Sequence, residues 1–276
     1  MKNYDILYTN GCSFTRGDRL PREETWPELL SEKLNLPLIN NSRNAQSMDS
    51  IASKTISDVL DYQDKKILVI IGMTWPDRYS LKFGNILLNW TSGDFKHLNS
   101  GLENRKQRLI ATKFTGIHHI IKGEDNKNIR PNMLYKDDKI LNQMEQGYES
   151  KFIAWAEKII TPYVRAVENH LKHDDSYMVN KVIQWYETIL QLKSFLKSLP
   201  NVEYRIVNFQ TLWDETAFGE DARKEVKKYR KHFQQDKNVL WLRDVVAKDL
   251  KSKGTSHPST EGCITLRDII YDSVNR

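Results

Sequence analysis

The stretch Lys66–Gly72 (KILVIIG) decides the fold class of this chain. A continuous apolar run of this length is typical of a central strand in a parallel sheet that is covered on both faces. The preceding segment, about Ser47–Tyr62, has helical periodicity, with apolar residues on one side at Ile51, Ile56, Val59 and Leu60. The two segments together predict a helix that leads into a buried strand.

Further strand and helix patterns alternate on either side of this strand. On the N-terminal side we expect a strand at Asp5–Asn10 (DILYTN), an amphipathic helix at Thr25–Lys33 and a strand at Leu36–Asn40. On the C-terminal side we expect strands at Val202–Phe209 and Asn238–Leu242, a helix between them at Glu220–Gln235, and a terminal helix from about Thr260 to Val274. Alternating units of this kind build a parallel sheet with helices on both faces, so the fold class is α/β.

The segment between about Tyr79 and Leu199 interrupts this alternation. Its first part, to about Met144, is polar, and we expect it to be irregular. Two helical patterns follow, one from Phe152 to Val167 and one from Val182 to Leu199, which we expect to pair as a helical hairpin. No Gly/Ser/Pro-rich linker follows, so we predict a single domain over 1–276 with an insertion at about 79–199.

Composition indicates a folded protein with an interior. The chain has 276 residues, of which 39% are hydrophobic and 10% aromatic, whereas disordered chains are depleted in aromatic residues. The longest apolar run, Ile67–Ile71, is far shorter than a membrane-spanning helix, and the N-terminus lacks the apolar stretch of a signal peptide. We therefore expect a cytoplasmic protein with no membrane contact.

The net charge of +6 would permit an anionic partner, but residues of both signs are interspersed along most of the chain. The densest basic stretch, Arg223–His232 (RKEVKKYRKH), has two interpretations. It either contacts phosphates of a nucleic acid or forms the solvated face of a helix, and the second is the favoured interpretation.

The sequence predicts no metal site and no cofactor. Cys12 and Cys263 are too few for a disulfide framework and lack the spacing of a zinc site, and the neighbouring histidines 118 and 119 are adjacent rather than four residues apart. No glycine-rich phosphate loop or dinucleotide motif is present. A cofactor-free reaction is therefore expected.

The loop after the first strand, Gly11–Thr15 (GCSFT), is the most informative for chemistry. Ligands of such sheets bind outside the carboxyl ends of the strands, and a serine at that turn lies near backbone N–H groups that stabilise an oxyanion. Ser13 is thus a candidate nucleophile, with helix capping as the alternative. Cys12 is a second candidate, but neighbouring side chains at a strand end point to opposite sides, so Cys12 is expected to face the core.

A second candidate lies near the other end of the chain, in the loop Thr255–Gly262 (TSHPSTEG) before the terminal helix. Proline disfavours helix at the residue before it, so His257 is expected in an extended loop. With a side chain that titrates near neutrality, His257 is suited to take the proton from Ser13 and return it to a leaving group. The alternative interpretation is an ordinary surface histidine.

Together these segments resemble the SGNH (GDSL-like) hydrolase family. Gly11–Thr15 is similar to its first block, whose serine is the nucleophile, and His257–Gly262 is similar to its last block, whose histidine is the base. The resemblance implies a three-layer α/β/α, flavodoxin-like fold with a central parallel sheet, here with a helical insertion. The opening NGCSFT is also similar to that of intracellular, phage-type members.

The resemblance also implies an oxyanion hole. Asn40–Ile51 is similar to the family's second block, where a small residue, here Ala45, supplies a backbone N–H. Ile71–Arg78 follows the central strand as the third block does, and Thr74 stands where the family has an asparagine. The implied donors are therefore the N–H groups of Ser13 and Ala45 and the hydroxyl of Thr74.

The largest departure from the family concerns the carboxylate that orients the histidine. The family usually has an aspartate three residues before it, and Gly254 occupies that position here. Losing this carboxylate costs about 10⁴ in turnover in serine proteases. Three alternatives stay open: a Ser–His pair with a backbone carbonyl orienting His257, a carboxylate from elsewhere such as Asp244 or Asp249, or a degenerate site that binds without cleaving.

Aromatic residues in and after the third block suggest a specificity region, with Trp75 and Arg78 as candidate substrate-binding residues. The sequence and the resemblance together predict a cofactor-independent serine ester hydrolase that forms an acyl-enzyme. A small-molecule or carbohydrate ester is the expected substrate. The alternatives are an SGNH-fold binding protein that has lost catalysis and, less favoured, a nucleic-acid-associated factor.

Overall fold

The computed structural model describes residues 3–17, 20–43, 46–76, 78–83, 86–91, 175–209, 220–242 and 257–275. The chain divides into two compact units. The first is discontinuous and combines Met1–Pro76 with Val179–Arg276, and the second is Asp77–Met178. Both ends of the chain thus belong to the first unit, which contains Ser13 and His257.

The first unit is built on a five-stranded sheet in the order β2-β1-β3-β6-β7. Its strands are β1 (Ile6–Asn10), β2 (Leu38–Asn40), β3 (Ile67–Gly72), β6 (Val202–Asn208) and β7 (Val239–Trp241). All four neighbouring pairs are parallel. When the strands of this sheet are counted along the chain, the order is that of flavodoxin-like folds, which confirms the predicted fold class.

Strand β3 lies in the middle of the sheet and every one of its residues is buried. It pairs along its whole length, with Ile67 opposite both Ile6 of β1 and Val202 of β6. A strand with neighbours on both edges and helices on both faces needs apolar side chains at every position, because neither face meets water. This is the physical reason for the unbroken KILVIIG run.

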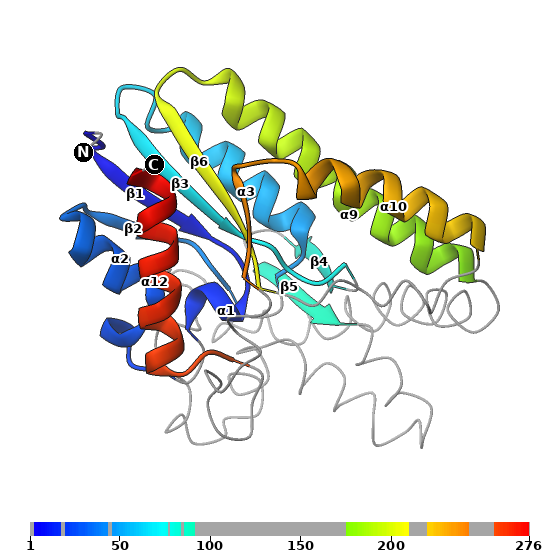
Figure 1. Cartoon of the computed structure of the whole chain (residues 1–276), viewed down its shortest axis with the longest axis horizontal. Coiled ribbons are helices and arrows are strands. Elements are labelled where there is room, and N and C mark those ends of the chain that lie inside the picture. The colour runs from blue at the N-terminus through cyan, green and yellow to red at the C-terminus, as the bar shows by residue number, and fades with distance from the viewer. Residues whose placement is uncertain are drawn as a thin grey trace. The chain divides into compact units, whose positions relative to one another are not determined.

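Helices cover both faces of this sheet, as Figure 1 shows. On one face, α2 (Trp26–Leu34) and α12 (Thr260–Asn275) pack together and share a hydrophobic cluster with the sheet. On the other face lies α3 (Met48–Leu60), followed by the neighbouring helices α9 (Asp175–Ser198) and α10 (Glu220–Gln234). Alternate residues of β1 serve the two faces: Leu7 belongs to the first cluster, whereas Tyr8 reaches Asp58 of α3.

The second unit contains a β-hairpin that the sequence analysis did not predict. Strands β4 (Arg78–Phe83) and β5 (Ile86–Thr91) pair antiparallel, with Phe83 opposite Ile86. The expectation of an irregular segment was therefore wrong at its beginning. Two strand-like runs separated by Gly84 and Asn85 are a hairpin signal, since such pairs favour tight turns between strands.

The predicted insertion is described only at its two ends. The helix expected over Val182–Leu199 is present as α9, and the helix expected over Phe152–Val167 lies outside the described residues. The boundaries of a single domain with an insertion at 79–199 stay a prediction. Within the described residues, no helix combines the length and apolarity needed to cross a bilayer.

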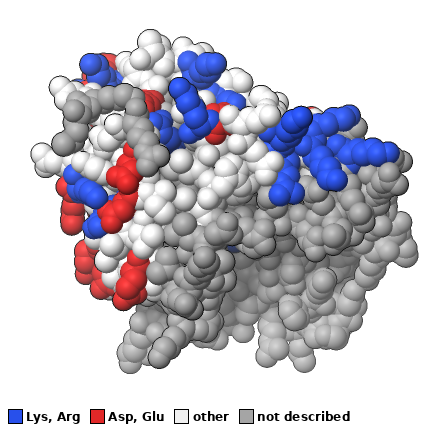
Figure 2. Space-filling view, in the orientation of Figure 1, with Lys and Arg blue, Asp and Glu red and all other residues white. Residues whose placement is uncertain are grey.

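The predicted basic stretch forms much of α10, where Lys224, Lys227, Lys228 and Lys231 are exposed. Figure 2 shows Lys and Arg side chains gathered over this helix. The opposite side of α10 is apolar: the ring of Phe233 is buried and stacks on Tyr186 of α9, with 5.3 Å between centroids. This amphipathic arrangement matches the interpretation as the solvated face of a helix, and nucleic-acid contact stays untested.

Candidate active site

The structure brings Ser13 and His257 into direct contact. Ser13 Oγ lies 2.8 Å from His257 Nε2, although the two residues are 244 positions apart in the sequence. Ser13 is buried, with 6% of its surface exposed, and His257 is half-buried. The separation is within the range for a hydrogen bond between a hydroxyl and an imidazole nitrogen, which is the contact that a nucleophile and its base require.

The single turn α1 (Ser13–Arg16) positions Ser13 at the carboxyl end of β1. The carbonyl of Cys12 accepts from the N–H groups of Thr15 and Arg16, at 3.0 and 2.9 Å. Gly17, at φ 76°, ends the turn in the left-handed region. Cys12 occupies the capping position and is fully buried in the hydrophobic cluster, as expected for a residue facing the core.

Close packing holds this turn against the central strand. The side chain of Thr15 lies between two glycines. A Cβ atom added to Gly11 would lie 2.3 Å from Thr15 Oγ1, and one added to Gly72 would lie 2.0 Å from the same oxygen. These separations are far below van der Waals contact, so only glycine allows α1 to approach β3 this closely. Gly11 and Gly72 therefore set where Ser13 lies.

His257 is positioned by contacts from both sides of its loop. The ring of Phe14 lies against the imidazole, with 4.9 Å between the ring centroids. On the other side, Ser259 caps α12: its carbonyl accepts from the N–H of Cys263, at 2.9 Å, and its Oγ accepts from the N–H of Gly262, at 3.2 Å. Thr260 also donates to Glu24 Oε2 at 2.6 Å, which ties the start of the helix to the 3₁₀ turn η1 (Arg22–Glu24).

Thr74, one of the predicted oxyanion donors, follows the end of β3. It is fully buried, and its hydroxyl has no hydrogen-bond partner among the residues that the structure describes. Its carbonyl accepts from Trp185 Nε1 of α9 at 2.8 Å, which fixes the backbone at this position. A buried hydroxyl held in place in this way has a donor to offer to a bound ligand.

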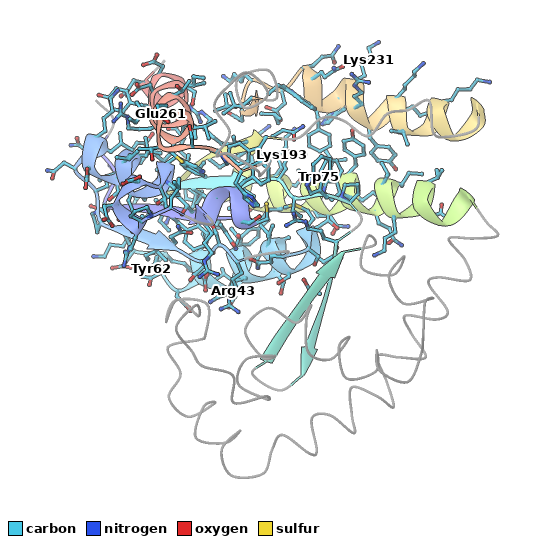
Figure 3. The ribbon with its side chains drawn as sticks, turned by 90° about the horizontal axis from the view of Figure 1, so that it is seen from below. Arg43, Tyr62, Trp75, Lys193, Lys231 and Glu261 are labelled. Atoms are coloured by element: carbon cyan, nitrogen blue, oxygen red, sulfur yellow. The ribbon has the colours of Figure 1, made fainter. Side chains whose placement is uncertain are left out.

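Other predicted site residues fall in different places. Trp75, labelled in Figure 3, is half-buried at the carboxyl end of β3. Arg78 begins β4 of the second unit, which is described separately from the unit that holds Ser13. Ala45 and all the positions considered for the orienting carboxylate lie outside the described residues; these positions are Gly254, Asp244 and Asp249.

A buried polar network beside the site was not predicted. The side chain of Asn10 accepts from the N–H of Gly11, at 2.8 Å, and its Nδ2 lies 3.1 Å from Thr55 Oγ1 of α3. Tyr8 donates to Asp58 Oδ2 at 2.7 Å. Burial and the charge of Asp58 raise the pKa of Tyr8, so the phenol stays protonated as a donor. The signal for this network in the sequence was the presence of Tyr8 and Asn10 in a strand whose other residues include apolar ones.

Two arginines, Arg16 and Arg43, stand in the segments that flank the Ser13 loop. Arg16 stands three residues after Ser13, and the N–H of Arg43 donates to the carbonyl of Gly11 at 3.1 Å. Both lie in segments that the sequence analysis singled out for other residues.

Within the described part of the chain, no group of three or more His, Cys, Asp or Glu residues is arranged to hold a metal ion. Both cysteines are free thiols and are buried. Burial raises the pKa of Cys263 to about 11, which keeps its thiol protonated at neutral pH. Since nucleophilic attack by cysteine needs the thiolate, Cys263 is a structural residue.

Comparisons with known proteins gave similarity only at the level of solved structures. No known family's model and no curated protein sequence matches the chain. The similar structures include the esterase EstA from Pseudoalteromonas sp., with 12% identity, a TM-score of 0.47 and coverage of 98% of this chain and 97% of that chain. A member of the lipolytic protein G-D-S-L family from Veillonella parvula DSM 2008 has 11% identity, a TM-score of 0.44 and 98% coverage of both chains.

A third similar structure is Axe2, an acetylxylan esterase from Geobacillus stearothermophilus, with 12% identity, a TM-score of 0.43 and coverage of 99% of this chain and 96% of that chain. The G-D-S-L family named among these structures is the family that the sequence motifs resemble. The functional argument for this chain rests on its own motifs and on the contact between Ser13 and His257.

Proposed function

We propose that this chain is a cofactor-independent ester hydrolase in which Ser13 is the nucleophile and His257 the general base. The single observation that carries the proposal is the 2.8 Å contact between Ser13 Oγ and His257 Nε2. For Nε2 to accept the hydroxyl proton, the neutral imidazole must carry its own proton on Nδ1. Ser13 then attacks the ester carbonyl while its proton passes to Nε2.

Each later step has a candidate group in the chain. The oxyanion of the tetrahedral intermediate would accept hydrogen bonds from the N–H groups of Ser13 and Ala45 and from Thr74 Oγ1. His257 then gives its proton to the leaving alcohol, and an acyl-enzyme remains on Ser13. Water attacks this ester with His257 again as base, which releases the acid and restores the free serine.

The missing local aspartate does not remove the means of orienting His257. The imidazole is in contact with Phe14, and the next helix is capped two residues after it by Ser259. These contacts restrict the position of the ring and support the alternative of a Ser–His pair, while the positions considered for a carboxylate lie outside the described residues. The substrate class we propose is a small-molecule ester or an acylated carbohydrate, in line with the motifs of the first and last blocks.

Hydrolysis of p-nitrophenyl acetate and of acetylated xylan oligosaccharides tests this proposal. We expect turnover by the wild type, and Ser13→Ala or His257→Ala should each lower kcat/KM by about 10²-fold to 10⁴-fold because nucleophile or base is lost. The matched controls are Ser198→Ala and His232→Ala, which change an exposed serine and an exposed histidine on other helices. Hydrolysis that survives Ser13→Ala would overturn the assignment of the nucleophile.

A further inference from the structure

Helix α9 contacts the candidate site through one buried indole. Trp185 Nε1 donates a hydrogen bond to the carbonyl oxygen of Thr74 at 2.8 Å, although the two residues are 111 positions apart in the sequence. Both side chains are buried, with 8% of Trp185 and 0% of Thr74 exposed. None of the motif blocks from which the site residues were predicted includes Trp185. The contact therefore adds to the site a residue that the sequence motifs did not indicate.

The backbone around Thr74 is held by two neighbouring elements. Before it, the N–H of Met73 donates to the carbonyl of Val207 in β6 at 2.8 Å. After it, the carbonyl of Thr74 accepts from the indole of Trp185. A carbonyl fixed in this way restricts rotation of the planar peptide that follows, and with it the backbone angle ψ of Thr74. The direction of the threonine side chain depends on that backbone conformation.

The hydroxyl is the part of Thr74 that these contacts leave available. Thr74 Oγ1 is buried and has no hydrogen-bond partner within the described residues. Most buried polar side chains in folded proteins are hydrogen-bonded, and leaving one without a partner is unfavourable. The main chain of Thr74 is thus fixed, while its side-chain donor can be used by a ligand.

Contacts along α9 hold the indole in turn. The ring of Tyr186 packs edge-on against Trp185, with 4.7 Å between the ring centroids, and stacks on Phe233 of α10 at 5.3 Å. Three residues after Trp185, Thr188 donates to Asp49 Oδ1 of α3 at 2.9 Å. Helix α9 is therefore tied to both α3 and α10, which restricts the movement of its indole.

We propose that Trp185 is a positioning residue for ester hydrolysis, which holds Thr74 so that its hydroxyl donates to the oxyanion. This inference rests on the proposed function, in which Thr74 Oγ1 is one of the oxyanion donors. Preorganised donors stabilise the charge that develops in the transition state, and a small misplacement of such a group lowers the rate steeply. Trp185 acts through Thr74 and not by contact with the substrate.

Two substitutions of Trp185 test this role, with p-nitrophenyl acetate as substrate at about pH 8, where a free imidazole is neutral. Trp185→Phe removes the indole N–H and keeps an aromatic ring. It should lower kcat about tenfold and change KM less than about twofold, because the oxyanion forms only in the transition state. Trp185→His places a ring nitrogen at the corresponding position of a five-membered ring, so it should retain more of kcat than Trp185→Phe although it fills less space.

The matched control is Trp241→Phe. The indole Nε1 of Trp241, in β7, is buried and has no hydrogen-bond partner within the described residues. This variant makes the same chemical change without the loss of a hydrogen bond, and it should leave kcat unchanged. Circular dichroism verifies the folding of each variant, and Trp185→Tyr replaces Trp185→Phe if the latter does not fold.

A double variant shows whether the effect passes through the threonine hydroxyl. Thr74→Val removes this hydroxyl and should lower kcat about 10²-fold or more, as for loss of one oxyanion donor. Added to Thr74→Val, Trp185→Phe should change kcat less than about twofold, because the group on which Trp185 acts is already gone. Values of kcat are counted per Ser13 that a fluorophosphonate probe labels to completion, so unfolded molecules do not contribute.

Three results would overturn the inference alone, in a wild type that hydrolyses the ester and reacts with the probe. The first is a Trp185→Phe variant that raises KM with kcat unchanged, and the second is a Thr74→Val variant with full kcat. The third is an equal loss of kcat from Trp185→Phe with and without the Thr74 hydroxyl. A folded wild type that neither hydrolyses the ester nor reacts with the probe would overturn the proposed function, and the inference with it.

Discussion

A single buried amide, Asn10, connects the end of β1 with both the loop that carries Ser13 and helix α3. Its Oδ1 accepts from the N–H of Gly11, while Nδ2 lies 3.2 Å from the carbonyl of Ile51 and 3.1 Å from Thr55 Oγ1. The side chain is fully buried, so each of these polar contacts replaces water that was lost on folding. At the residue scale, Asn10 is therefore a structural support of the loop that holds Ser13.

Replacing this amide by a carboxylate tests that support. We expect Asn10→Asp to lower the free energy of unfolding by about 2–4 kcal/mol, because the new group cannot donate and brings a buried negative charge toward a carbonyl and Asp58. The control is Asn201→Asp, whose amide donates to the carbonyl of Lys65 at 2.6 Å in an exposed position. Urea denaturation followed by circular dichroism measures both changes, and equal losses in the two variants would contradict the role of Asn10.

At the scale of elements, the position of α1 depends on its packing against β3. Thr15 Oγ1 is buried, has no hydrogen-bond partner within the described residues, and fills the space that Gly11 and Gly72 leave open. An added Cβ at Gly72 would lie 2.0 Å from this oxygen but 3.4 Å from Thr15 Cβ. The clash therefore comes from the hydroxyl and not from the rest of the threonine.

This geometry predicts that one substitution repairs another. Gly72→Ala should displace α1 and lower esterase activity about tenfold or more, since small misplacements of catalytic groups are costly. Adding Thr15→Ala removes the clashing oxygen and should restore most of the lost activity, while Thr15→Ala alone should have little effect. Measured kcat/KM values for the two single variants and the double variant give the coupling between the sites. Simple additivity of the two single effects would contradict the packing argument.

The sequence predicted the elements of the sheet well for a physical reason. Strand β3 is buried on both faces and so must be apolar throughout, and the helices that cover the sheet carry one apolar side, as in α3. Local periodicity reports such burial directly. The hairpin of β4 and β5 was missed, although its two strand-like runs are separated in the sequence by Gly-Asn, a pair typical of hairpin connections.

The contacts within the site were less predictable than the elements that carry it. Ser13 and His257 were identified from short motifs, but the buried polar contacts of Tyr8 and Asn10 depend on how β1 and α3 meet. No local pattern encodes such a meeting, because the partners are far apart in the sequence. Tertiary structure was needed to show that these residues share one place.

At the scale of the whole molecule, the candidate site exists only because the first unit joins the two ends of the chain. Met1–Pro76 supplies Ser13, and Val179–Arg276 supplies His257. In the first unit α12 packs against α2, and Thr260 at its start bonds to Glu24 just before α2. The same contacts that close the fold therefore hold His257 against Ser13.

The most direct test of the central claim, that His257 activates Ser13, is labelling with a fluorophosphonate probe followed by intact-protein mass measurement. The account predicts one covalent adduct on the wild type, none on Ser13→Ala, and labelling of His257→Ala that is slower by about 10²-fold to 10⁴-fold, the usual contribution of a general base. An adduct that persists on Ser13→Ala, or a folded wild type that forms none, would contradict it.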